Sequence, residues 1–154
     1  MKKTIKFAVI ISALCAPVQA FAVTGNVLFN ADVNNTCVIT IVDAGIMKGN
    51  VGLTQLSSEN AGGQAGLATV ATTSSAYSVN VNAPIAFSTF PTGGAATSFA
   101  AKYSTTGASV YTNQTAANPL AIGTTNVQVN LAAIKATGSF PTGTYAATVV
   151  LRCE

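Results

Sequence analysis

The sequence predicts an all-β protein, an antiparallel β-sandwich of about seven to nine short strands. Apolar and polar residues alternate with a period of two along most of the chain, which is typical of strands that bury one face. Turn-forming residues recur about every ten positions. Charged residues make up only 7% of the sequence, so the Glu and Lys content of helical proteins is missing. A small β-barrel is the alternative architecture.

Residues 1–22 have the features of a secretory signal peptide. Three lysines precede the apolar run "FAVIISALCA", and in the Ala-Phe-Ala sequence of residues 20–22 the two alanines supply small side chains for a signal peptidase. Cleavage after Ala20 is the alternative to cleavage after Ala22. The apolar run is shorter than the roughly 18 residues that a membrane-spanning helix requires. We therefore expect an exported chain without a transmembrane segment.

Strands are expected wherever the alternation is sustained. The first covers residues 23–33, where Val, Gly and Phe at odd positions oppose Thr and Asn at even positions. The other predicted strands are 37–42, 67–73, 76–82, 98–104, 108–113, 125–134 and 143–153. The Gly- and Ser-rich stretch 57–66 is predicted to be a mobile connection. Residues 83–94 contain two prolines, so we expect an edge or loop there that carries core side chains.

Cys37 and Cys153 are the two cysteines that remain after the expected cleavage. Two cysteines in an exported chain predict one disulfide, and two buried free thiols are the alternative. Both cysteines stand at odd-numbered positions, as do the apolar residues that face one side of their strands. Both thiols are therefore expected to face the core. The register near Cys37 also depends on the turn-forming residues 34–36.

The composition excludes several functions. Beyond residue 22 the chain has four basic and four acidic residues, so its net charge is zero and it offers no basic patch for nucleic acid. It contains no histidine, the usual general base and nitrogen ligand, and no motif of a hydrolase, phosphate-binding loop or metal site. We expect no enzyme activity, no cofactor and no metal.

The stretch "VTGNVLFNADVNNTC" (23–37) resembles the N-terminus of chaperone–usher fimbrial subunits, and the chain is also similar to spore-coat-U-like secreted subunits. The resemblance lies in a glycine within an alternating segment, then G-x-V-x-F-like residues and a cysteine further on. It implies an immunoglobulin-like sandwich (37–154) that lacks its last strand, preceded by a donor-strand segment (23–36). The donor residues would be Val23, Gly25, Val27, Phe29 and Ala31.

The resemblance also implies partners and a location. The partners would be further copies of the chain or sibling subunits, a periplasmic chaperone and an outer-membrane usher, and the polymer would lie on the cell surface. Two features depart from the fimbrial pattern: the second cysteine is penultimate, and the chain ends in "VVLRCE" with Tyr145 as its last aromatic residue. The alternative is a self-complete secreted sandwich that binds a glycan or surface protein through Phe87, Phe90 and Tyr111.

Overall fold

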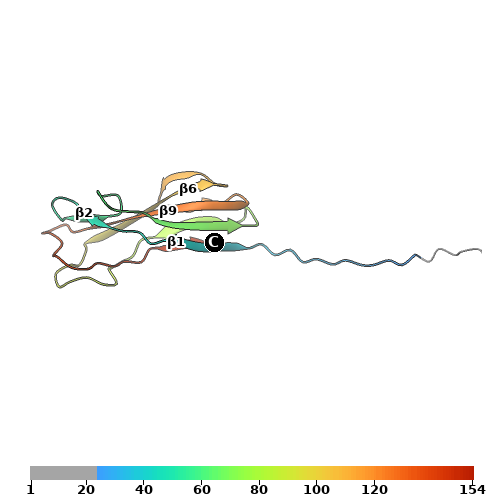
Figure 1. Ribbon diagram of the computed structural model, residues 1–154, viewed down its shortest axis with the longest axis horizontal. Helices are drawn as coiled ribbons and strands as arrows, with labels where there is room; N and C mark the ends of the chain where they lie inside the picture. Colours follow the sequence, from blue (N-terminus) through green and yellow to red (C-terminus); the bar gives the residue numbers. More distant parts are fainter. Residues whose placement is uncertain (1–23) are drawn as a thin grey trace, which may run out of the picture. The chain divides into compact units, whose positions relative to one another are not determined.

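A computed structural model describes residues 24–154, and the expected signal peptide (1–22) and Val23 lie outside the described residues. Residues 24–154 contain no helix, and residues 24–36 contain no strand. The strands, shown in Figure 1, are β1 (Cys37–Asp43), β2 (Lys48–Gly49), β3 (Gln55–Ser57), β4 (Gly66–Thr72), β5 (Ser78–Asn82), β6 (Ser98–Gly107), β7 (Tyr111–Gln114), β8 (Asn118–Pro119), β9 (Gly123–Ile134) and β10 (Val150–Cys153).

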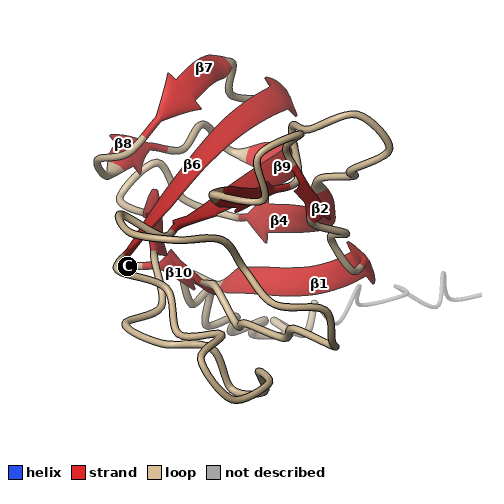
Figure 2. Cartoon of the chain, turned by 90° about the vertical axis from the view of Figure 1, so that its left-hand side faces the viewer, coloured by secondary structure: helices blue, strands red, loops and turns tan. Residues whose placement is uncertain are grey.

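The strands form two antiparallel sheets that pack against each other as a sandwich, so the predicted fold class is confirmed. The larger sheet has the order β1-β4-β9-β3-β2, with β6 on the other side of β9 and β7 beside β6. The smaller sheet has the order β10-β5-β8. In Figure 2, β1 of the larger sheet and β10 of the smaller sheet are neighbours.

The core lies between the sheets and is formed by the alternate residues that face inward. Val70 from β4, Val79 from β5, and Tyr103 and Val127 from β6 and β9 are almost completely buried. A second cluster gathers Leu56, Phe87, Ala133 and Phe140. The strand predicted at 76–82 is confirmed as β5, in which Val79 and Val81 are buried whereas Ser78, Asn80 and Asn82 are half-buried.

Some elements differ from the sequence-based expectation. The short strands β2, β3 and β8 were not predicted, because two or three residues are too few to show a period of two. The last predicted strand, 143–153, is reduced to Val150–Cys153, although burial still alternates from Tyr145 onward. The predicted first strand, 23–33, is not a strand over its described residues. A single amphipathic strand gains its hydrogen bonds only from a partner.

No helix within residues 24–154 is long and apolar enough to cross a membrane.

Candidate functional site

Among the strands of residues 24–154, β1 and β10 are each hydrogen-bonded on one side only. β1 is the last strand of the larger sheet, where β4 is its one neighbour, and β10 is the last strand of the smaller sheet, where β5 is its one neighbour. An unpaired strand edge presents a row of main-chain N–H and C=O groups that can accept another strand. The two edges therefore define the place in the domain where a strand could be added.

The hydrogen-bond pattern fixes which residues of β1 point their main chain to the open side. The N–H of Thr73 donates to the C=O of Thr36 at 3.1 Å, so this is a hydrogen-bonded pair. Because such pairs alternate in antiparallel sheets, the main-chain N–H and C=O groups of Val38 and Thr40 point to β4. The N–H and C=O groups of Ile39 therefore point away from β4, and those of Cys37 and Ile41 share this direction.

The same reasoning applies to β10. Glu154 and Ser78 exchange two main-chain hydrogen bonds, at 3.0 and 2.7 Å. The main-chain groups of Arg152 and Val150 therefore point to β5. The main-chain groups of Leu151 and Val149 point away from β5. The exposed main-chain groups of both edges thus belong to odd-numbered residues, whose side chains face the core side.

A groove of about 350 Å³ lies between these two edges. One wall comes from β1 and the segment that follows it, the floor from β4 and β9, and the other wall from residues 147–151. The main lining side chains are Ile41, Met47, Ala68, Val129, Leu131, Ala147, Val149 and Leu151. Because most of these side chains are apolar, the groove is suited to bind apolar side chains.

Ile41 shows that the groove is open. It shares the core-facing parity of Cys37 and Ile39, which are half-buried, yet 67% of its side chain is exposed. A large apolar residue on the inward face of a strand is normally covered. Within residues 24–154 no strand pairs with the free edge of β1, so Ile41 stays uncovered.

Asp43 is the one ionisable residue among those that line the groove. Elsewhere, Lys102 and Glu59 form an exposed ion pair at 2.8 Å. Within residues 24–154, no group of three or more His, Cys, Asp or Glu side chains is arranged to hold a metal ion. The groove can bind a partner through apolar contact and main-chain hydrogen bonds.

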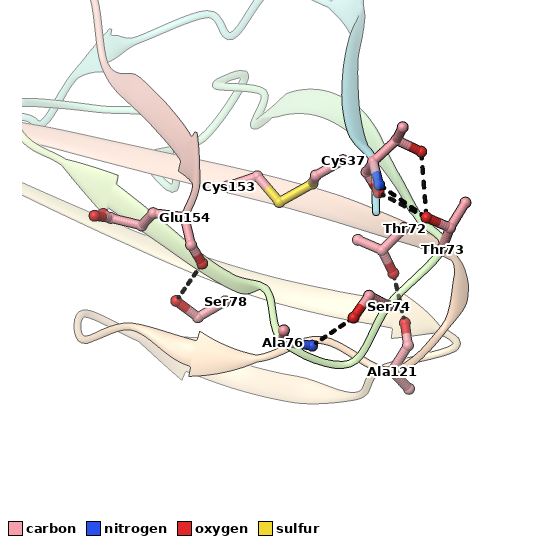
Figure 3. Close-up of a disulfide and its surroundings, with 10 residues drawn as sticks. Cys37, Thr72, Thr73, Ser74, Ala76, Ser78, Ala121, Cys153 and Glu154 are labelled. Atoms are coloured by element: carbon pink, nitrogen blue, oxygen red, sulfur yellow. Dashed lines mark hydrogen bonds between the residues drawn. A yellow bond between two sulfur atoms is a disulfide. The ribbon is translucent and has the colours of Figure 1, made fainter. Parts of the chain in front are cut away.

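A disulfide joins β1 to β10 at one end of the groove, as Figure 3 shows. The predicted Cys37–Cys153 pair is confirmed, with the two Cα atoms 6.4 Å apart. Hydrogen bonds hold both strand ends beside it: Thr36 N–H donates to Thr73 Oγ1 at 2.8 Å, and Ser78 Oγ donates to the C=O of Glu154 at 3.2 Å. From this fixed end, the groove extends to Asp43 on the side of β1 and to Ala147 on the side of β10.

The predicted donor residues lie in the segment that has no strand. Val27 and Phe29 are 75% and 88% exposed, and Gly25 and Ala31 are exposed as well. A Cβ atom added to Gly25 would meet no atom within 4 Å. Val23 lies outside the described residues. The structure therefore gives this segment an exposed row of apolar side chains.

The aromatic residues of the alternative binding hypothesis are mostly structural. Phe87 is buried and packs edge-on against Phe99 and Tyr145, with ring centroids 4.8 and 5.1 Å away. Phe90 is 45% exposed at the margin of this cluster. Tyr111 is half-buried, and its hydroxyl donates to the C=O of Pro119 at 2.6 Å. These three residues do not form a common exposed surface, because Phe87 is part of the core.

The resemblance to fimbrial subunits implies a missing last strand and therefore a groove, but the side chains that line the groove were not identified from the sequence. The alternation places Ile41, Val149 and Leu151 on inward faces, but it does not tell which strands become neighbours. The nearest signal in the sequence was the predicted disulfide between Cys37 and Cys153, which joins β1 to β10.

A disulfide is consistent with an exported protein, because such bonds persist in oxidising compartments. Comparisons with family models, with curated proteins and with solved structures give no significant match to this chain.

Proposed function

We propose that this protein is a structural subunit of a bacterial surface fimbria, or pilus, that polymerises by donor-strand exchange without catalysis. Residues 23–31 of one copy would fill the groove of the next copy. The observation that carries the proposal is the apolar groove between β1 and β10, toward which both strands direct unpaired main-chain groups.

A strand suits this groove better than a small apolar ligand does. Strand addition gains affinity from main-chain hydrogen bonds and specificity from alternate side chains that enter pockets. A small apolar molecule would cover Ile41 and Leu151 but would leave both strand edges unpaired. The sequence of β1, "CVITIVD", contains no Lys or Pro that would protect its edge from association.

Residues 23–31 fit the groove in composition and in length. The segment "VTGNVLFNA" has no charged residue, which suits a groove with apolar walls. An extended nine-residue segment spans about 30 Å, which exceeds the roughly 17 Å of the five-residue wall 147–151. Its odd-numbered side chains, Val27 and Phe29 among them, would enter the groove, and Gly25 would lie where the floor leaves no room for a side chain.

The proposal implies helper proteins and a location. An open groove with exposed apolar side chains needs a temporary cover before the next subunit arrives, so a periplasmic chaperone would bind here first. An outer-membrane usher would then exchange the chaperone for the donor segment. The zero net charge beyond residue 22 removes a repulsion that would oppose close packing of identical subunits.

The test replaces one groove side chain by a charged one. Ile41→Asp places a carboxylate on the groove wall, where a donor segment would have to bury it, so assembly should be lost. The folded subunit should tolerate the change, because Ile41 is already 67% exposed. Light scattering reports the oligomer size and thermal unfolding reports the stability.

Val38→Asp is the matched control. Val38 lies on the same strand, is 56% exposed and points to the opposite face of the sheet. The Val38→Asp variant should assemble like the unmodified protein. Equal assembly of both variants would argue that the groove is not the acceptor site. Loss of assembly in both variants would show that a charge on either face of β1 prevents assembly, so that the loss is not specific to the groove.

A further inference from the structure

We infer that Lys102 and Asn130 form a covalent amide crosslink between β6 and β9, with Glu59 as the proton carrier and Ser58 as the hydrogen-bond donor to the reacting carbonyl. The crosslink lies outside the groove and does not depend on the proposed function. An amine, a carboxamide and a carboxylate from three separate segments of the chain meet at this place.

The register of the larger sheet places Lys102 directly opposite Asn130. The two residues are partners in the antiparallel pairing of β6 with β9, which lie side by side in Figure 1. Opposite side chains in such a pair have Cβ atoms about 5 Å apart and share one face of the sheet. The amine of Lys102 stands on a long flexible stem, so Nζ can reach Cγ of Asn130 without a change in the main chain. The neighbouring residues Val129 and Leu131 face the other side and line the groove.

Hydrogen bonds orient the carboxamide of Asn130. The N–H of Leu131 donates to Ser58 Oγ at 3.1 Å, and the Ser58 hydroxyl in turn donates to Asn130 Oδ1 at 2.9 Å. The N–H of Ser58 donates to the C=O of Leu131 at 3.0 Å, so the main chain of Ser58 is also held to β9. Ser58 is only 7% exposed. A fixed, buried donor therefore polarises the carbonyl group of Asn130.

Glu59, the next residue in the chain after Ser58, holds the amine. Its Oε1 atom lies 2.8 Å from Lys102 Nζ. Beyond residue 22 the chain has only four basic and four acidic residues, and this is the one ion pair within residues 24–154. An exposed ion pair adds little stability, so stability does not account for its position. Its position beside a carboxamide with a hydrogen-bonded carbonyl suits an exchange of one amide for another.

The surroundings favour a neutral amine. The three reacting groups line one cavity of about 240 Å³, and most of the other lining side chains are apolar: Ala100, Ala101, Leu131, Ala132 and Ile134. The side chains of Lys102 and Glu59 are 34% and 48% exposed, so both are partly shielded from water. Partial burial penalises the charged forms of both groups, which favours transfer of a proton from the ammonium to the carboxylate. The neutral amine is the nucleophile.

The reaction balances without an oxidant or reductant. Glu59 takes a proton from the Lys102 ammonium, and Nζ attacks Cγ of Asn130 while the Ser58 hydroxyl stabilises the charge on Oδ1. Glu59 gives its proton to the departing Nδ2 and takes the remaining extra proton from Nζ. The Nζ–Cγ bond forms, the Cγ–Nδ2 bond breaks, and ammonia leaves with that proton as ammonium. Glu59 ends as a carboxylate, and the step occurs once in each chain.

The experiment measures the mass of the full mature chain, purified from a periplasm and reduced at its disulfide. Loss of ammonia should lower the mass by about 17 Da relative to the sequence. Chymotrypsin cleaves after aromatic residues and leucine, so it should release residues 100–103 joined to residues 121–131 as one branched peptide. Tandem mass spectrometry should place the link between Lys102 and Asn130.

Three variants, each checked for folding by circular dichroism, assign the roles. Lys102→Arg keeps the positive charge beside Glu59 but removes the nucleophile, so this variant should have the full mass. Glu59→Gln keeps the shape of the side chain but cannot carry a proton, and it should form the crosslink about 100-fold more slowly or less. Lys48→Arg is the matched control, because Lys48 is an exposed lysine in β2, and it should keep the loss of mass.

Each other outcome overturns the inference. A mature chain with its full mass would show that no crosslink forms. A loss of ammonia that persists in Lys102→Arg would show cyclisation of an asparagine with its own main chain instead. Unchanged crosslinking in Glu59→Gln would remove Glu59 as the proton carrier and with it the proposed reaction. If a variant does not fold, the branched peptide of the unmodified chain still decides whether the bond exists.

Discussion

Tyr103 illustrates how single residues hold the two sheets together. It is fully buried in β6, and its hydroxyl lies 3.0 Å from the C=O of Val79 and 2.9 Å from the C=O of Ala116. The side-chain amide of Asn118 donates to the same hydroxyl at 2.8 Å. Burial raises the pKa of Tyr103 above its usual value, and the Asn118 hydrogen bond partly opposes this. The residue thus links the larger sheet to the smaller one through a satisfied polar group.

We expect Tyr103→Phe to lower the free energy of unfolding by roughly 1–3 kcal/mol, because a buried C=O of β5 loses its donor. The folded protein holds the phenolic proton more tightly than the unfolded chain does. The contribution is therefore complete below pH of about 10 and is lost as the pH rises through the higher pKa of the folded state. Urea unfolding between pH 7 and 11 measures both effects.

The alkaline loss of stability should be smaller in Tyr103→Phe than in the unmodified protein. It should not vanish, because burial also raises the pKa of Tyr145. An equal alkaline loss in the two proteins would show that Tyr103 does not titrate with unfolding.

The free edge of β10 separates main-chain groups that hold the domain together from groups that remain open to a further strand. Val149 and Val150 are adjacent residues whose main-chain N–H groups point in opposite directions. The N–H of Val150 points to β5, whereas the N–H of Val149 points to the groove. A proline at either position removes one main-chain donor. The two positions therefore separate a hydrogen bond that holds the domain together from one that is available to a donor strand.

We expect Val150→Pro to lower the free energy of unfolding by roughly 1–3 kcal/mol, because a ladder hydrogen bond is lost and Asn82 keeps an unpaired C=O. Val149→Pro should stay within about 0.5 kcal/mol of the unmodified protein. It should nevertheless weaken assembly, since one N–H of the acceptor edge is gone. Denaturant unfolding and light scattering of both variants test this, and a stable Val150→Pro protein would contradict the assigned ladder.

Much of this element structure could be predicted from the sequence, because inward and outward residues alternate. The parity of Tyr145, Val149 and Cys153 is observed as alternating burial, and the disulfide follows from two cysteines with matching parity. The residues that line the groove could not be predicted. Parity places Ile41 on an inward face, but only the packing of two sheets decides whether that face is covered. Pairing between strands distant in sequence leaves no local signal.

At the scale of the whole molecule, the disulfide closes a loop of 116 positions between the first and last strands. A loop of this length contributes roughly 4–5 kcal/mol in the chain-entropy model. This matters because the domain has an open groove between its sheets and, under the proposed function, would have to stay folded until a donor filled it. Filling the groove would add stability by mass action, in proportion to the affinity and concentration of the donor.

Removal of residues 23–31 shows most directly whether this segment joins one subunit to the next. Mature protein and a variant without residues 23–31, both purified from a periplasm, are compared by size-exclusion chromatography with light scattering and by thermal unfolding. Residues 24–31 form no strand, and their large apolar side chains are exposed. We expect that the assemblies formed by the intact chain disappear and that the shortened subunit stays folded as a monomer with an unchanged Tm. A shortened chain that unfolds, or that assembles as before, would contradict it.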